Sequence, residues 1–326
     1  MKRVLSGIRP TGRLHLGNYL GAVKGMLELQ NSPDYECFFM VVDVHALTTP
    51  YNIQELKVDR SEVVIDYLSA GLDPKKSPIF IQSMVPEHME LAFYVASVLT
   101  VARMQHLPTF KDKVKQHPDH ATLALLNYPA LMAADILMYK ASAVPVGIDQ
   151  EPHIEVAREV ARKMNAVYGT DFPEPARFET EGGYIPSLLG EGKMSKSIEG
   201  SFITLRDDLD TIKDRLAKVP TDSGKGLEIP SQGSISNLLT FVEVFMGRSA
   251  RKECETAYLG EGLRYKDLKE ELAKAIFEQI KPIQEKRKEL EANPEYVDCV
   301  ISEGGKRAQK VAKQTIAEVK EKMGLG

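Results

Sequence analysis

The chain has 326 residues, of which 43% are hydrophobic and 27% charged, and its formal net charge is −4. These values suggest a folded soluble protein of two domains and exclude a general electrostatic attraction to nucleic acid. The longest apolar run, residues 91–102, is too short to cross a bilayer, and the three cysteines form no CxxC pair of the kind that binds zinc or iron–sulfur clusters. We therefore expect a reduced, cytoplasmic protein without a metal site of its own.

The first half of the chain alternates short apolar segments with amphipathic ones. Strands are expected at residues 4–6, 37–42, 79–81 and 144–146. Helices are expected at about residues 19–29, 56–71, 127–139 and 151–164. This alternation predicts an α/β fold with a Rossmann-like, doubly wound parallel sheet.

The second half of the chain shows only helical periodicity. It is found at residues 205–216, 235–245, 265–290 and 293–323, with a loop rich in Pro, Gly and Ser at 220–233. We therefore expect a Rossmann-like domain over residues 1–200 and an all-helical domain over residues 201–326. Six basic residues against two acidic ones near the carboxyl terminus fit either the solvated face of a helix or a contact with RNA.

Two segments carry the clearest chemical signal. The sequence KMSKS at residues 193–197 follows Gly190-Glu191-Gly192, which places two ammonium groups three residues apart on a segment that is free to close. Residues 9–18 (RPTGRLHLGN) lie at a strand-to-helix turn, where backbone N–H groups can hold phosphate. Either segment alone could be an ordinary loop. Together they predict adenylate formation, in which one segment holds a nucleotide and the other neutralises charge on a leaving pyrophosphate.

Four residues around the upstream segment have specific expected roles. Gly7 and Gly17 would let the backbone approach a nucleotide closely. His15 and Asn18 could donate hydrogen bonds to phosphate or ribose oxygens. The alternative is a loop with routine turn glycines, which the KMSKS segment in the same domain disfavours.

Asp135 stands in the otherwise apolar run of residues 131–137. Burying a carboxylate costs several kcal/mol unless a donor faces it. Helical spacing places Tyr128, Met132, Asp135 and Tyr139 on one stripe, which could line an aromatic pocket where Asp135 accepts the N–H of an indole. Spacing alone fits equally well with a bond to an internal Arg or Tyr. A phenol could also donate, but a site built around an N–H would reject phenylalanine because the carboxylate would be left unpaired.

A second polar cluster, residues 147–150, follows a short strand, the usual place for ligand contacts in an open α/β sheet. Asp149 and Gln150 could bind a ribose and a substrate amino group, although Asp149 could also be a helix N-cap. Lys111 and Lys113 form a second basic loop that is either part of the site or solvated surface.

His45 ends the second strand, within the sequence DVHALT. It could act as a general base. Adenylation needs no base, however, because the attacking carboxylate is already an anion. We therefore interpret His45 as part of a pocket wall.

These segments together resemble the class I aminoacyl-tRNA synthetases, and specifically the bacterial tryptophanyl-tRNA synthetase family, nearly end to end. The resemblance is carried by residues 6–12, 17–19, 43–46, 131–137, 144–150, 193–197 and 235–239. Each match is weak alone, but their order and spacing are specific. The tyrosyl-tRNA synthetase family shares the fold and the lysine loop, and the MAADIL and VPVGxDQ sequences favour tryptophan over it.

The resemblance implies the site residues. ATP would be bound by Arg9, Pro10, Thr11, Gly17, Asn18, Gly147, Ile148, Asp149, Ile185, Lys193, Met194, Ser195, Lys196 and Ser197. Asp135 would bind the indole N–H, within a tryptophan pocket that also contains Leu5, Gly7, His45, Tyr128, Met132, Val144, Val146 and Gln150. The catalytic groups would be His15, in a HIGH-type motif, and the lysines that handle the triphosphate, namely Lys111, Lys113, Lys193 and Lys196.

The resemblance also implies the reaction and the partners. The chain would be a ligase that activates L-tryptophan with ATP to tryptophanyl-adenylate and transfers it to the 3′ end of tRNA(Trp). Mg²⁺ would be held mainly by the phosphates of ATP. The family is homodimeric, and residues 201–326 would read the tRNA anticodon.

The chain departs from the family pattern at two positions. Leu5 stands where many members have an aromatic residue against the indole, and Ile148 replaces a common acidic residue. Neither change touches a polar contact, so we expect altered binding strength rather than altered specificity. Two other functions remain open, a nucleotidyltransferase for a small molecule and a non-enzymatic sensor. The helical domain disfavours the first, and the intact motifs disfavour the second.

Overall fold

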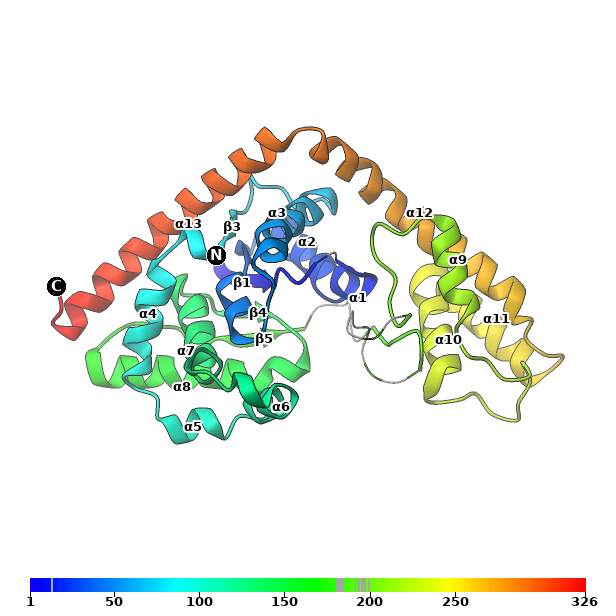
Figure 1. Ribbon diagram of the computed structural model, residues 1–326, viewed down its shortest axis with the longest axis horizontal. Helices are drawn as coiled ribbons and strands as arrows, with labels where there is room; N and C mark the ends of the chain where they lie inside the picture. Colours follow the sequence, from blue (N-terminus) through cyan, green and yellow to red (C-terminus); the bar gives the residue numbers. More distant parts are fainter. Residues whose placement is uncertain (13, 180–184, 191, 193, 195–197, 199) are drawn as a thin grey trace. The chain divides into compact units, whose positions relative to one another are not determined.

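A computed structural model describes residues 1–12, 14–179, 185–190, 192, 194, 198 and 200–326 (Figure 1). Contacts divide the chain into two compact units. Unit 1 consists of residues 1–12, 24–181 and 290–326, and unit 2 of residues 13–23 and 182–289. This division differs from the expected boundary at residue 200, because the last helix packs on unit 1 and residues 13–23 belong with unit 2.

Unit 1 is built on a parallel sheet with the strand order β3-β2-β1-β4-β5. The strands are β1 (Lys2–Ile8), β2 (Tyr35–Val41), β3 (Ile79–Ile81), β4 (Ala143–Pro145) and β5 (Ala176–Phe178). Register places Val4 of β1 beside Cys37 of β2 and Ala143 of β4. The expected α/β fold is therefore confirmed. Strand β5 was not expected from the sequence, since its three residues contain no apolar run.

Helices cover the sheet in unit 1. They are α2 (Lys24–Asn31), α3 (Ile53–Ser69), α4 (Glu87–Ala96), α5 (Val101–Gln105), α6 (Pro108–Gln116), α7 (Leu123–Met138), α8 (Glu151–Tyr168) and α13 (Pro294–Met323). Helix α7 contacts both α4 and α8 and is buried over most of its length. It begins earlier than expected because the Thr122 side chain accepts a hydrogen bond from the Leu125 N–H and caps the helix.

Helix α13 crosses the edge of the sheet at β3 (Figure 1). A Cβ atom on Gly304 would lie 1.9 Å from the carbonyl oxygen of Ile79, so only glycine allows the helix to approach this closely. Arg307 donates to the carbonyl of Pro74, and Lys306 pairs with Glu303. The Lys306 pair lies within α13, whereas the Arg307 bond ties the helix to the loop after α3.

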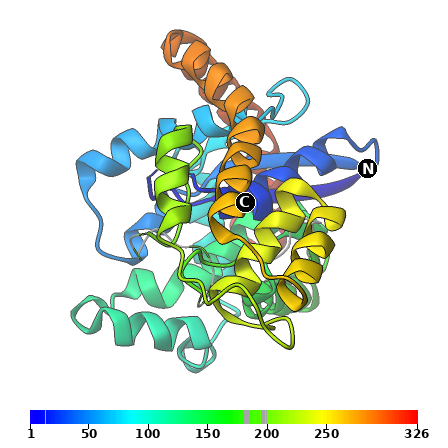
Figure 2. The ribbon, with the colours of Figure 1, turned by 90° about the vertical axis from the view of Figure 1, so that its right-hand side faces the viewer.

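Unit 2 is mostly helical. It contains α1 (Leu16–Asn18), the π-helical turn η1 (Tyr19–Val23), α9 (Leu209–Ala217), α10 (Gly233–Met246), α11 (Arg248–Leu259) and most of α12 (Tyr265–Glu291). The views in Figure 1 and Figure 2 show α9 to α12 side by side. Lys269 and Gln284 of α12 donate to the carbonyls of Val219 and Leu205. Helix α11, which is strongly charged, was not expected from the sequence. In the part of the chain that the structure describes, no helix is both long and apolar enough to span a membrane.

Candidate active site

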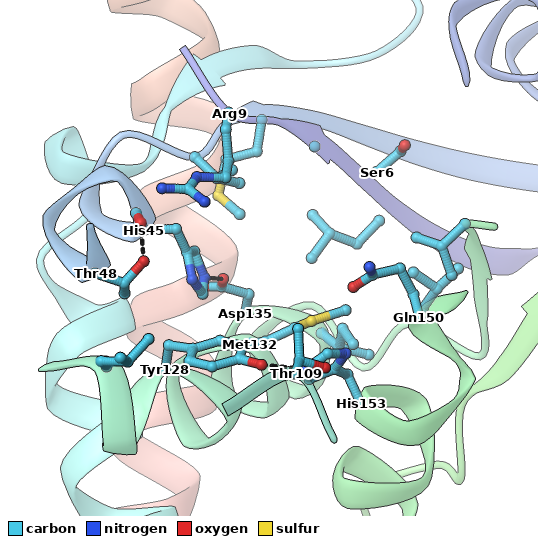
Figure 3. Close-up of a pocket in the computed structure, with 18 of the residues that line it drawn as sticks. Ser6, Arg9, His45, Thr48, Thr109, Tyr128, Met132, Asp135, Gln150 and His153 are labelled. Carbon is cyan, nitrogen blue, oxygen red and sulfur yellow. Dashed lines mark hydrogen bonds and ion pairs between the residues drawn. The ribbon is translucent and has the colours of Figure 1, made fainter. Parts of the chain in front are cut away.

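A cavity of about 330 Å³ opens in unit 1 where β1, β2 and β4 end (Figure 3). This volume lies within the usual range of small-molecule sites. The sheet extends to β2 on one side of β1 and to β4 on the other, and such a reversal of strand order is where open α/β sheets bind ligands. The expected site residues that line the cavity are Leu5, Gly7, Arg9, His45, Lys113, Tyr128, Met132, Asp135, Val144, Val146 and Gln150.

The stripe expected on α7 divides between the cavity and the core. Tyr128, Met132 and Asp135 line the cavity. Tyr139, the C-cap of α7, is fully buried away from it, and its hydroxyl lies 2.8 Å from Nε2 of His88. The cavity wall is thus largely apolar, with Asp135 as a carboxylate on it.

Asp135 is only 3% exposed, and donors of the protein surround its carboxylate. Nε2 of His45 lies 2.8 Å from Oδ2, and Nδ1 of His88 lies 2.7 Å from Oδ1. The Gln82 amide nitrogen lies 2.8 Å from Oδ1 and 3.0 Å from Oδ2. Burial opposes ionisation, but the bonds from His45 and His88 outweigh it, so the pKa of Asp135 lies below its usual value. The carboxylate is therefore an anion at neutral pH.

These partners resolve part of what the sequence left open. The internal partners of Asp135 are two histidines and a glutamine, not an Arg or Tyr. The carboxylate also has donors without any ligand, so the expected reason for rejecting phenylalanine does not hold. Gln82 and His88 were missed, because they lie 53 and 47 residues from Asp135. The sequence indicated Gln82 only weakly, as the first polar residue after a buried strand.

Two cationic groups, Arg9 and Lys113, line the cavity as well. Figure 3 shows Arg9 across the cavity from Tyr128 and Met132. Burial lowers the pKa of Arg9, with an opposing effect of Tyr128, and burial together with the charge of Arg9 lowers the pKa of Lys113. Two cations that affect each other in this way offer a site for an anion.

A hydrogen bond to the buried His153, which was not expected from the sequence, supports Tyr128. Its hydroxyl lies 2.5 Å from Nε2 of His153 on α8 and also hydrogen-bonds Thr109 on α6. Burial raises the pKa of Tyr128, and the Thr109 bond and the charge of Arg9 oppose this shift. Burial lowers the pKa of His153. The pair therefore stays neutral and fixes the position of the phenol ring.

The cluster at residues 147–150 forms the short 3-10 helix η5 (Ile148–Gln150). Gln150 lines the cavity and donates to the carboxylate of Asp149. The N-cap residue of α8 is Gln150, which makes no side-chain cap, so Asp149 is not the N-cap that the sequence allowed. Ile148 is 69% exposed. Neither the three residues 147–149 nor Lys111 line the cavity.

Unit 2 brings other expected nucleotide residues together. Nδ1 of His15 accepts the backbone N–H of Asn18, while the Asn18 side chain accepts the N–H of His15. Because Nδ1 is an acceptor here, a neutral His15 carries its proton on Nε2. A Cβ atom on Gly17 would lie 2.9 Å from the His15 ring and 3.3 Å from Cβ of Met194. The Met194 N–H donates to the carbonyl of Ile185.

The remaining expected residues are placed only in part. Pro10 and Thr11 follow β1 in unit 1, and the Thr11 N–H donates to the carbonyl of Arg9. Four residues of the KMSKS segment lie outside the described part of the chain, namely Lys193, Ser195, Lys196 and Ser197.

Known proteins resemble the chain over its full length. The family model of the class I tRNA synthetases (W and Y) matches residues 1–281. The tryptophan–tRNA ligase of Caldanaerobacter subterraneus subsp. tengcongensis is 42% identical, over 100% of this chain and 99% of that protein. The corresponding ligase of Porphyromonas gingivalis is 39% identical over 100% of both.

Solved structures agree with these relatives. The tryptophanyl-tRNA synthetase of Campylobacter jejuni, in complex with ADP and tryptophan, is 33% identical with a TM-score of 0.85, over 99% of this chain and 100% of that chain. The Mycoplasma pneumoniae enzyme is 30% identical with a TM-score of 0.87, over 100% of this chain and 98% of that chain. The chain therefore belongs to the class I tRNA synthetases for tryptophan and tyrosine, and within them to the bacterial-type tryptophanyl-tRNA synthetases.

Proposed function

We infer that this chain activates L-tryptophan with ATP and transfers the tryptophanyl group to the 3′ end of tRNA(Trp). The observation that carries this inference is the cavity, whose largely apolar wall holds a buried, ionised carboxylate and two cations. An indole side chain is apolar except for one N–H donor, and a triphosphate is an anion. One cavity in unit 1 therefore offers matching groups to both substrates.

The proposed tryptophan pocket places the indole N–H at Asp135. The ring would pack between Met132 of α7 and Val144 of β4, and Gln150 would lie near the amino acid's polar end. The other side chains proposed around the amino acid are Leu5, Gly7, His45, Tyr128 and Val146. All of these residues line the cavity, which supports the assignment.

The residues proposed to bind ATP are Arg9, Pro10, Thr11, Gly17, Asn18, Ile185 and residues 147–149. His15 would donate through Nε2 to the nucleotide. Lys111, Lys113 and the KMSKS segment, residues 193–197, would bind the phosphates. Mg²⁺ would be held mainly by these phosphates, since it retains water ligands and binds nucleotides in this way in other enzymes.

The proposed chemistry has two steps. A carboxylate oxygen of tryptophan attacks the α-phosphorus of ATP, the bond to the bridging oxygen breaks, and pyrophosphate leaves with that electron pair. A terminal ribose hydroxyl of the tRNA then attacks the adenylate carbonyl, loses its proton and releases AMP. No protein nucleophile is needed, so the protein contributes orientation and charge stabilisation.

The proposal extends to assembly and to the role of the helical segment. Residues 201–326 would read the tRNA anticodon, and the enzyme would act in the cytoplasm as a homodimer. Two exposed apolar side chains one turn apart on α4, Met89 and Phe93, support a subunit interface, since Phe93 is 79% exposed.

The experiment that tests the proposed function is ATP–pyrophosphate exchange, run separately with each of the twenty amino acids. Only tryptophan should support exchange. In a second assay, tRNA(Trp) should accept the tryptophanyl group. Exchange with tyrosine would support the proposed adenylation reaction but contradict the assignment of the cavity as a tryptophan pocket. Absence of exchange with every amino acid would instead support a non-enzymatic sensor.

The loop lysine Lys196 provides a prediction about catalysis. Lys196→Ala should slow ATP–pyrophosphate exchange by about 100-fold or more, because the ammonium group stabilises charge that develops on the leaving pyrophosphate. The Kd for tryptophan should change by less than about threefold, because the lysine acts only in the transition state. The chain contains 0 Trp residues, so the fluorescence of the ligand reports binding directly. Equal losses in rate and affinity would contradict the assigned role.

A further inference from the structure

The acceptor positions of Asp135 are occupied by the protein itself. Oδ1 faces His88 and Gln82, and Oδ2 faces His45 and Gln82, all within 2.7–3.0 Å. A carboxylate has about four lone-pair sites. A substrate N–H therefore cannot simply be added to this carboxylate. One of the protein donors has to give up its place.

Two of the three donors are held from a second side. His88 is fully buried, and its other ring nitrogen lies 2.8 Å from the Tyr139 hydroxyl. Gln82 is also fully buried, and its amide oxygen accepts the backbone N–H of Val44. Neither residue lines the cavity. Moving either one would leave a buried polar group without its partner, which is unfavourable.

His45 differs from the other two donors. Its ring lines the cavity beside Asp135 (Figure 3), and its side chain keeps 11% of its exposure. It lies on the short 3-10 helix η2 (Val44–Thr48), where Thr48 holds its backbone carbonyl but not its ring. The ring can therefore leave Oδ2 without uncovering a buried group, because the cavity is open to it.

We propose that His45 is a displaceable donor that limits how strongly the pocket selects for the indole N–H: it occupies Oδ2 of Asp135 in the free site, and the indole N–H takes its place when tryptophan binds. The proposal rests on the tryptophan-activating function inferred above. When a ligand without an N–H donor binds, His45 stays on Oδ2, so the carboxylate keeps all of its hydrogen-bond donors. When tryptophan binds, the hydrogen bond from His45 is thus replaced by one from the indole. This bond by itself discriminates only weakly between tryptophan and a ligand without an N–H.

The test compares tryptophan with β-(3-benzothienyl)alanine, in which sulfur replaces the indole N–H. The wild-type Kd ratio of the analogue to tryptophan should be about tenfold or less, since one hydrogen bond is exchanged for another. His45→Ala removes the competing donor, so tryptophan should bind at least as tightly as before. The analogue would then leave Oδ2 with the Gln82 amide as its only donor, one donor fewer than when tryptophan binds, and the ratio should rise by about tenfold or more.

Two further variants separate this effect from a change in pocket shape. His45→Gln restores a donor of similar reach and should return the ratio toward the wild-type value. Val146→Ala alters the wall without touching Asp135, and should change both Kd values by the same factor. Thermal unfolding of each variant checks that it folds. An unchanged ratio in His45→Ala, or a raised ratio in Val146→Ala, overturns the proposal.

A direct measurement on the wild-type protein complements the variants. The ¹⁵N chemical shift of Nε2 in His45 should change when tryptophan binds and stay in place when the analogue binds. An identical response to both ligands contradicts displacement. Failure of the wild-type protein to bind tryptophan at all would overturn the proposed function instead, so the two failures are distinguishable.

Discussion

Asp135→Asn should lower kcat/KM for tryptophan in ATP–pyrophosphate exchange by about 100-fold or more. The substitution replaces an anion by an amide of the same shape, and hydrogen bonds to a charged group contribute about 1.5–3 kcal/mol each. The amide also has only one acceptor oxygen, so its NH₂ group would face an N–H of Gln82, His88 or His45. A loss of about 2.7 kcal/mol corresponds to about 100-fold in rate.

A second buried aspartate serves as the control for this prediction. Asp43 is 5% exposed and accepts hydrogen bonds from Ser83 and Arg60, but it does not line the cavity. Asp43→Asn should lower the free energy of unfolding while leaving kcat/KM for tryptophan within about threefold. Similar kinetic losses in the two variants would show that Asp135 acts through stability and not as a ligand of tryptophan.

Gly304→Ala should lower the free energy of unfolding by about 2 kcal/mol in total, because overpacking costs about 1–3 kcal/mol and a clash with backbone lies at the upper end of that range. The added Cβ would lie 1.9 Å from the carbonyl oxygen of Ile79, so α13 or β3 has to move. The gain in helix propensity from glycine to alanine, about 1 kcal/mol, offsets only part of this cost. Chemical denaturation with urea, followed by circular dichroism, measures the change.

The neighbouring glycine offers a matched control. A Cβ on Gly305 would lie 3.6 Å from the flexible end of Met84, an ordinary contact. Gly305→Ala should therefore leave stability unchanged or raise it by up to about 1 kcal/mol. Equal effects at the two positions would contradict the close approach of α13 to β3. Since β3 leads directly into Gln82, Gly304→Ala should also weaken tryptophan binding more than Gly305→Ala does.

The packing of α13 illustrates what the sequence could not predict. Its helical periodicity and its start at Asn293 are local features, and they were readable from spacing and from the cap. Nothing local indicates that the helix belongs with the first unit, because this depends on contacts with β3, α3, α4 and α7. The domain boundary expected at residue 200 followed a change of composition, whereas the units follow contacts.

The candidate site also combines features that the sequence predicts with features that depend on tertiary contacts. The sequence alone determined the α/β fold, three of the four residues in the stripe on α7 and the order of the motifs, because periodicity and motif spacing are properties of neighbouring residues. Only the tertiary structure decided that Gln82, His88 and His45 converge on Asp135, since these residues come from separate segments that meet where the strands end. A buried carboxylate requires donors, and the sequence shows that requirement without showing which residues meet it.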